Sequence, residues 1–170
     1  MQPRIIRRWE RVPGALTTLE RLHEYADNLA TNEQDKRGAC RTQWIIVTED
    51  DAVILMTPWE DEAEKMLHIT WLRQSLQNQK VLRYAFICEA WLRRADLKRP
   101  GEFGERVDSL IINSVERGGR HFWKQYEVGK GRGKKRTRTV SDLSLVESVQ
   151  GLMFDLFGNS PPETPEAPSP

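Results

Sequence analysis

Two stretches of the chain have apolar residues at every third or fourth position, which is the spacing of an amphipathic helix. The first covers residues 15–30, and its apolar side contains Leu16, Leu19, Leu22, Ala26 and Leu29. The second is preceded by Thr57, Pro58 and Glu60, which have the pattern of a helix N-cap, and it extends from Trp59 to about Asn78. The side of this helix that is predicted to face the core contains Ala63, Met66, Leu67, Thr70 and Trp71.

Short apolar runs and period-two alternation predict the first strands. Residues 43–47 and 52–56 are apolar runs on either side of TEDD, so we expect a hairpin, either within the main sheet or as a separate flap. Residues 80–94 are predicted to form a central strand, with Tyr84, Phe86 and Cys88 on one face and Glu89 on the other. Phe86 and Cys88 are therefore expected to be buried.

The second half of the chain has the pattern of consecutive hairpins. A loop rich in Pro and Gly is predicted for residues 95–105, a strand for 107–116 and a tight turn for Gly118 and Gly119. Strands expected over 121–128 and 135–143 flank a basic, Gly-rich tip. A short helix over 144–158 precedes a Pro-rich acidic segment, which has too few apolar residues to pack.

Consecutive strands that are joined by short turns pair in antiparallel fashion. The sequence therefore predicts an α+β fold, a mostly antiparallel β-sheet of about five or six strands with two or three helices packed on one face. Because 170 residues suffice for one ordinary domain, we expect residues 1–158 to form a single α+β domain and residues 159–170 to form a disordered tail.

The composition indicates a globular protein with a highly charged surface, since 38% of the residues are hydrophobic and 30% are charged. No segment has the roughly 18 to 20 apolar residues of a membrane span, and the first residues lack the apolar core of a signal peptide. We therefore expect a cytoplasmic protein without membrane contact. Cys40 and Cys88 match neither a disulfide framework nor the CxxC spacing of a metal site, so both are expected to be reduced thiols.

The formal net charge of +1 conceals an asymmetry. Residues 129–140 have six cations and no acid, so the rest of the chain has a net charge of −5. The six cations are Lys130, Arg132, Lys134, Lys135, Arg136 and Arg138. Such a tip suits the phosphates of a polyanion, because each contact releases counterions. On the preceding strand, Trp123 is a candidate for base stacking and Lys124 for a further contact.

The first hypothesis is therefore a non-enzymatic accessory protein that contacts the phosphate backbone of DNA or RNA through the basic hairpin. For the tip itself, the alternatives are an acidic protein partner and no specific role. The second hypothesis is a protein-interaction module, such as an inhibitor or regulator encoded by a phage or mobile element. Its contacts would be the acidic face of the second helix, Trp59, Trp91 and the segment MFDLFG at 153–158.

No arranged set of catalytic groups stands out, so we expect no enzyme, no metal site and no cofactor. His23, His68 and His121 lack the i, i+4 spacing of a helical zinc site, and GKGRGKK lacks the spacing and the Ser or Thr of a phosphate loop. Glu89 interrupts an apolar strand, and acid catalysis with Asp108 is conceivable. A partly wet sheet face, or a pair with an arginine, is the simpler interpretation.

The segments QWIIVTEDDAVILM, YAFICEAW and VDSLIINSVERGG follow one another in this order, with a charged helix and a Pro-containing loop between them. In this pattern, which includes Glu89-Ala90-Trp91, the chain resembles a group of small uncharacterised bacterial and phage proteins. The likeness covers about residues 43–128 and leaves the basic tip outside. It implies a fold of this element order and a mobile-element origin, and it implies no activity.

Overall fold

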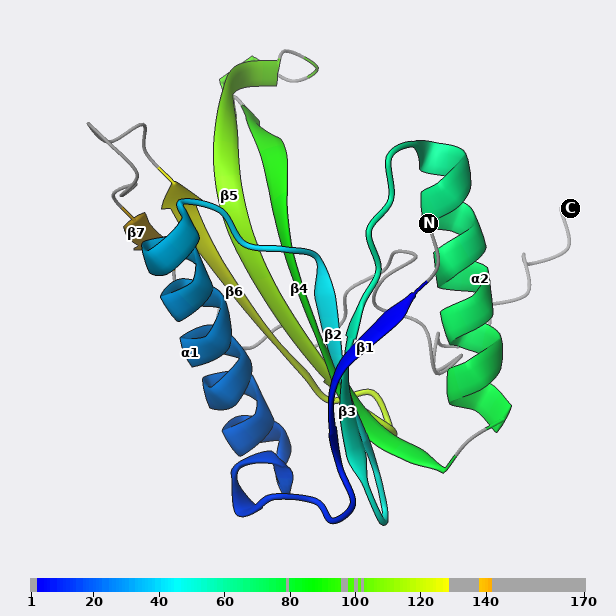
Figure 1. Cartoon of the computed structure of the whole chain (residues 1–170). Coiled ribbons are helices and arrows are strands. Elements are labelled where there is room, and N and C mark those ends of the chain that lie inside the picture. The colour runs from blue at the N-terminus through cyan, green and yellow to red at the C-terminus, as the bar shows by residue number, and fades with distance from the viewer. Residues whose placement is uncertain are drawn as a thin grey trace, which may run out of the picture.

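One antiparallel sheet of seven strands forms the centre of the computed structural model, which describes residues 3–78, 80–95, 98–99, 101, 103–128 and 138–141 (Figure 1). The strands are β1 (Arg4–Trp9), β2 (Gln43–Thr48), β3 (Ala52–Met56), β4 (Val81–Ala95), β5 (Phe103–Glu116), β6 (His121–Val128) and β7 (Arg138–Ser141). Their order across the sheet is β1-β3-β2-β4-β5-β6-β7. The helices are α1 (Leu19–Arg37) and α2 (Glu62–Asn78), and Gly14–Leu16 form a 3-10 turn. The predicted antiparallel α+β fold is confirmed.

The two helices cover opposite faces of the sheet, so the prediction that the helices pack on one face is wrong (Figure 1). The side chains that α1 packs on the sheet are Leu22, Ala26 and Ala30. Those of α2 are Ile69, Leu72 and Leu76. The cause lies in β2, where Ile45 faces α1, Trp44 faces α2, and both are completely buried. A strand that is apolar at successive positions is typical of a sheet covered on both faces.

The buried side of α2 differs from the prediction. Its buried side chains are His68, Ile69, Leu72 and Leu76. The side chains predicted for the core are exposed instead: Ala63, Met66, Leu67, Thr70 and Trp71. This helix has apolar residues on two sides, and the sheet selects between them because Ile69, Leu72 and Leu76 pack on the large aromatic side chains of β2 and β4. An exposed apolar stripe remains on the outer side of α2.

The start of α2 is capped by Asp61 and not by Thr57. The Asp61 carboxylate accepts a hydrogen bond from the Glu64 N–H at 2.8 Å, and the Glu64 carboxylate accepts one from the Glu60 N–H at 2.8 Å. This reciprocal pattern satisfies two backbone donors at the helix start. Thr57 is completely buried, and its hydroxyl accepts a hydrogen bond from Nε1 of Trp44 at 2.9 Å. Thr57 therefore lies in the core, and α2 begins at Glu62, too far along the chain for Thr57 to cap it.

The central strands follow the predicted alternation. Phe86 is only 4% exposed and faces α2, Cys88 lies half-buried on the same face, and Glu89 faces α1. The predicted hairpin of residues 43–56 belongs to the main sheet, because β2 lies between β3 and β4, and so it is not a flap. Gly118 and Gly119 form the tight turn between β5 and β6 with φ of 106° and 99°, a region that favours glycine.

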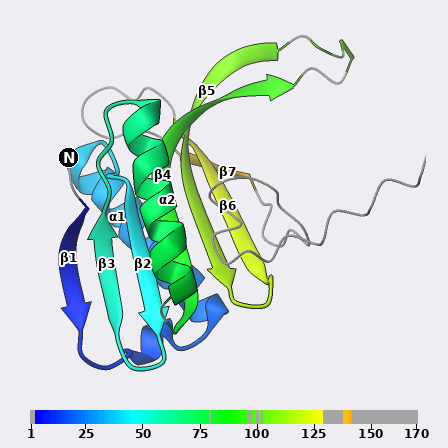
Figure 2. The same cartoon turned by 90° about the vertical axis from the view of Figure 1, so that its right-hand side faces the viewer.

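Two features of the sheet were not predicted. β1 is an additional strand at one edge, paired with β3. β4 and β5 continue as a two-stranded ribbon beyond β6, since their pairing reaches Ala95 and Phe103 while the pairing of β5 with β6 begins at Ser109 (Figure 2). Residues 103–105 therefore belong to a strand and not to the predicted loop. The helix predicted over 144–158 and the tail at 159–170 lie outside the described residues.

Candidate nucleic-acid interface

The strands that flank the basic tip form the expected hairpin. β6 and β7 pair in antiparallel fashion from Gln125 and Ser141 to Val128 and Arg138. The connection between them, residues 129–137, lies outside the described residues, and it contains Lys130, Arg132, Lys134, Lys135 and Arg136. Arg138 is the first residue of β7. Because Val128 and Arg138 are register partners, the connection with five cations begins and ends at one point of the sheet.

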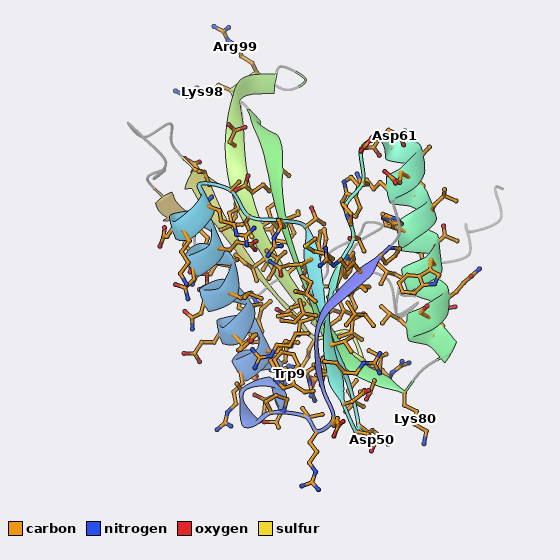
Figure 3. All side chains as sticks on the ribbon, in the orientation of Figure 1. Trp9, Asp50, Asp61, Lys80, Lys98 and Arg99 are labelled. Carbon is orange, nitrogen blue, oxygen red and sulfur yellow. The ribbon has the colours of Figure 1, made fainter. Side chains whose placement is uncertain are left out.

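The β6–β7 connection and the β4–β5 connection leave the sheet at the same end, because β4 and β6 are both antiparallel to β5. The β4–β5 ribbon projects at this end (Figure 2), and Lys98 and Arg99 are exposed at its tip (Figure 3). Neighbouring strands lie about 4.8 Å apart, so the basic connection starts roughly 5 to 10 Å from β5. Cations from two connections are thus attached to one end of the sheet.

Lys124, which the sequence suggested as a nucleic-acid contact, is engaged within the fold. Its Nζ lies 2.6 Å from Oδ2 of Asp27 on α1, and Tyr126 donates its hydroxyl to Oδ1 of the same carboxylate at 2.6 Å. The hydrogen bond to Asp27 raises the pKa of Lys124. The pair fastens β6 to α1, so the charge of Lys124 is already compensated, and we omit Lys124 from the proposed contacts.

Trp123 lies on the opposite face of β6 from Lys124, because successive residues of a strand point to opposite faces. Its side chain is half-buried, and its register partner on β5 is Asn113. Asn113 is completely buried, and neither Oδ1 nor Nδ2 has a hydrogen-bond partner in the described part of the chain. Trp123 and Lys124 therefore do not form one contact surface, and base stacking by Trp123 stays a prediction.

His23 on α1 makes a second contact with the β5–β6 pair. Its Nδ1 lies 2.8 Å from Oγ of Ser114, and its ring lies 5.5 Å from the ring of Phe122. Burial lowers the pKa of His23 to about 4, an effect that Asp27 opposes and Lys124 reinforces. The folded protein therefore holds this imidazole in its neutral form at neutral pH.

Acid should destabilise the fold through His23. As the pH falls from 6.5 towards 4, the unfolded chain binds a proton at His23 that the folded chain does not, so the free energy of unfolding should decrease by at most about 3 kcal/mol. Below pH 4 the folded chain also binds this proton, so the free energy of unfolding should not decrease further through His23. His23→Asn keeps a polar group near Ser114 and should flatten this dependence in urea unfolding measured between pH 6.5 and 4. An identical pH dependence in both proteins would contradict the assignment.

Glu89 anchors the connection between α1 and β2. Its Oε1 accepts a hydrogen bond from the backbone N–H of Cys40 at 2.8 Å and one from Nε2 of Gln34 at 3.3 Å. Gln34 is almost completely buried, so the carboxylate satisfies an amide donor that water does not reach. This contact gives a structural reason for a carboxylate in an otherwise apolar strand.

Neither cysteine of the chain has the properties of a reactive thiol. Burial raises the pKa of Cys88 to about 12 and also raises the pKa of Cys40, so neither thiol is activated as a thiolate at neutral pH. Among the described residues, no group of three or more His, Cys, Asp or Glu side chains could hold a metal ion. Neither described helix is long and apolar enough to cross a membrane.

A second cationic group, which the sequence interpretation missed, lies at the opposite edge of the sheet. A groove of about 440 Å³ between β1 and α1 is lined by Arg7, Lys36, Arg37 and Arg41 among other residues. The sequence signal for it is RIIRRW, which has three arginines and no acid in six residues. Lys36 and Arg37 of α1, together with Arg41, are distant from β1 in the sequence and are brought beside Arg7 by the fold.

The chain was compared with protein-family models, with curated proteins and with solved structures. None of the three comparisons finds a match. The resemblance to small bacterial and phage proteins therefore stays a prediction, and the function of this protein is inferred from its geometry and charge.

Proposed function

We propose that this protein binds the phosphate backbone of nucleic acid through the connection between β6 and β7. The register of the two strands carries the proposal, since the pairing of Val128 with Arg138 attaches a connection with five cations and no acid to one point of the sheet. The proposed phosphate contacts are Lys130, Arg132, Lys134, Lys135, Arg136 and Arg138. Each contact would release condensed counterions, which favours binding at low salt.

The composition of the connection favours contacts with the backbone over the reading of bases. Gly129, Gly131 and Gly133 alternate with cations, and a glycine has no side chain that restricts the backbone. Cations on such a chain suit phosphates, which are the same at every nucleotide, better than the fixed donor and acceptor pattern of a base edge. We therefore expect little sequence preference.

The β4–β5 ribbon supports the same function. A two-stranded ribbon is narrow enough to enter the major groove of a duplex, which is about 12 Å wide. The ribbon extends past Val128, the last residue of β6, at the end of the sheet where the basic connection starts, and its tip has Lys98 and Arg99 (Figures 2 and 3). Nucleic acid bound at this end of the sheet could therefore contact both connections at once.

Changing Lys134, Lys135 and Arg136 together to glutamine should weaken binding to mixed-sequence DNA and RNA. Removal of three phosphate contacts should lower the slope of log affinity against log salt by about 2 to 3 units. Fluorescence anisotropy of labelled oligonucleotides at several salt concentrations measures the slope. The melting temperature should stay unchanged, because the variant leaves every core side chain of the described residues in place.

A matched control removes three cations from the opposite end of the sheet. Arg11, Arg21 and Lys80 are exposed: Arg11 follows the end of β1, Arg21 lies in the first turn of α1, and Lys80 lies at the far end from Lys98 and Arg99 (Figure 3). Their combined change to glutamine lowers the net charge by the same amount and should leave the salt slope almost unchanged. If both triple variants reduce the slope equally, binding reflects overall charge, and the proposal for the β6–β7 connection is wrong.

A protein-interaction module is the second candidate function, and the exposed stripe on α2 favours it. Leu67 is 70% exposed and Trp71 46%, and Ile5 on β1 is 49% exposed. Large apolar side chains that gather on a surface are typical of binding sites. Of the contacts named from the sequence, Trp59 is partly buried and packs against the core beside Phe86. The segment 153–158 lies outside the described residues, and for Trp91 only the backbone is described.

A further inference from the structure

We propose that the outer edge of β1 binds an extended acidic segment of a partner protein as an eighth strand of the sheet. The inference deepens the second candidate function and rests on it, and it is independent of nucleic-acid binding. In the described part of the chain, β3 is the only strand that pairs with β1. The outer backbone groups of an edge strand are a template for a further strand.

The charges of β1 select an acidic occupant over a second copy of the chain. Arg4, Arg7 and Arg8 are exposed, and Ile6 forms a bulge in the pairing with β3. Two paired copies of β1 would bring three arginines from each strand together with no acidic side chain in either, which disfavours self-association. The same three charges attract a strand with glutamate or aspartate side chains. Arg8 already lies 4.0 Å from the carboxylate of Asp51.

On the α2 face, an apolar groove runs beside the edge strand. Its volume is about 640 Å³, and its lining consists of Pro3, Ile5, Leu55, Glu64, Leu67, His68 and Trp71. Ile5 projects from β1 into this groove, opposite Leu67 and Trp71 on α2. The groove would therefore accept apolar side chains from a strand that lies along β1 and would remove the exposed stripe from water.

On the α1 face, the groove beside β1 is cationic. Ile6, Tyr25 and Leu29 supply its apolar surface, and four cations line it against one carboxylate, that of Glu33. Glu33 already forms ion pairs with Arg41 and Arg37. Arg7 stacks 4.5 Å above the ring of Trp9, and Trp9 meets Tyr25 edge to face at 6.1 Å, which holds the guanidinium at the groove.

The two grooves together define the sequence of the partner strand. Side chains of a strand alternate between its faces, so every second residue would enter the apolar groove and the residues between would face the cations. β1 has six residues, so the partner segment would have about six. We expect leucine, isoleucine or phenylalanine to alternate with glutamate or aspartate.

A labelled six-residue peptide of alternating glutamate and leucine tests the proposal with the full-length protein. Anisotropy should show saturable binding, and the peptide with lysine in place of glutamate should not bind. In an antiparallel strand, alternate residues point their backbone groups to the same edge. Two further peptides have methyl groups on the backbone nitrogens of either all leucines or all glutamates. Only one of these two sets of nitrogens would face β1, so only one of the two peptides should fail to bind. Loss of binding in both peptides, or in neither, would overturn strand addition.

Exposed residues on α2 supply matched protein variants. The double variant Leu67→Ser/Trp71→Ala lacks two side chains that line the apolar groove. Its affinity for the peptide should be lower by about tenfold or more. Met66→Ser changes a residue of the same helix that is 41% exposed and outside the lining, and it should bind as the original protein does. Equal affinity for all three proteins would refute the apolar groove as the binding site.

The outcomes separate this inference from the nucleic-acid proposal. The variant with Lys134, Lys135 and Arg136 changed to glutamine should keep its peptide affinity, and the Leu67→Ser/Trp71→Ala variant should keep its nucleic-acid affinity. If the variant with Lys134, Lys135 and Arg136 changed to glutamine no longer binds the peptide, the peptide binds the basic connection, and the β1 site is wrong. A stable dimer in sedimentation that the peptide does not dissociate would assign the edge to a second copy and overturn the proposal.

Discussion

Replacement of Phe86 by alanine should lower the free energy of unfolding by about 3 to 5 kcal/mol. Phe86 is 4% exposed, and its ring centroid lies 4.2 Å from that of Trp44 and 6.3 Å from that of Trp59. The hydrogen bond of Trp44 to Thr57 restrains the neighbouring indole, so the cavity is expected to persist in the variant. A loss of this size would unfold a marginally stable domain.

Urea unfolding measures this effect, with a second apolar substitution as its control. Leu67→Ala removes a side chain that is 70% exposed, and it should change the free energy of unfolding by less than about 0.5 kcal/mol. A Phe86→Ala protein with an unfolding midpoint close to that of the original chain would show that the core between α2 and the sheet is assigned incorrectly.

Replacement of Glu33 by alanine should cost about 3 kcal/mol. Glu33 is 9% exposed, and its Oε2 accepts a hydrogen bond from Nε2 of Gln43 at 2.6 Å, while Oε1 accepts from Nε of Arg41. Gln43 is 2% exposed, so its amide would keep only the weak acceptor Sγ of Cys40, where water does not replace the carboxylate. The connection between α1 and β2 should loosen as a result.

Glu24 provides the matched control, because it lies on the same helix and is exposed. Glu24→Ala should leave the unfolding curve almost unchanged, and Glu33→Gln, which keeps an acceptor oxygen, should fall between the two alanine variants. Equal stability of Glu24→Ala and Glu33→Ala would mean that the buried carboxylate does not support the fold.

The sequence predicted the central strands well, because their alternation of apolar and polar residues allows only one assignment of side chains to the two faces. In β4, Phe86 is buried and Cys88 half-buried on one face, which places Glu89 on the other, and the register agrees with this alternation. The burial of β2 on both faces could also have been predicted, since QWIIV has no polar residue between Trp44 and Val47. A fully apolar run indicates helices on both faces.

Other features depend on contacts between distant parts of the chain. α2 has two apolar sides, and its orientation follows from packing on Trp44 and Phe86. β1 has a short run with three arginines, and its pairing with β3 makes it a strand. Lys124 meets Asp27, 97 residues away, so no local pattern distinguishes its structural role from that of a phosphate contact.

The most direct test of the nucleic-acid function is a titration of the unmodified protein with single-stranded and double-stranded DNA and RNA at two salt concentrations. We predict binding at micromolar protein in low salt, with a slope of log affinity against log salt of about −5 if all six cations contact phosphate. Absence of binding at low salt with micromolar protein, or an affinity that does not change with salt, would contradict the function proposed for the β6–β7 connection.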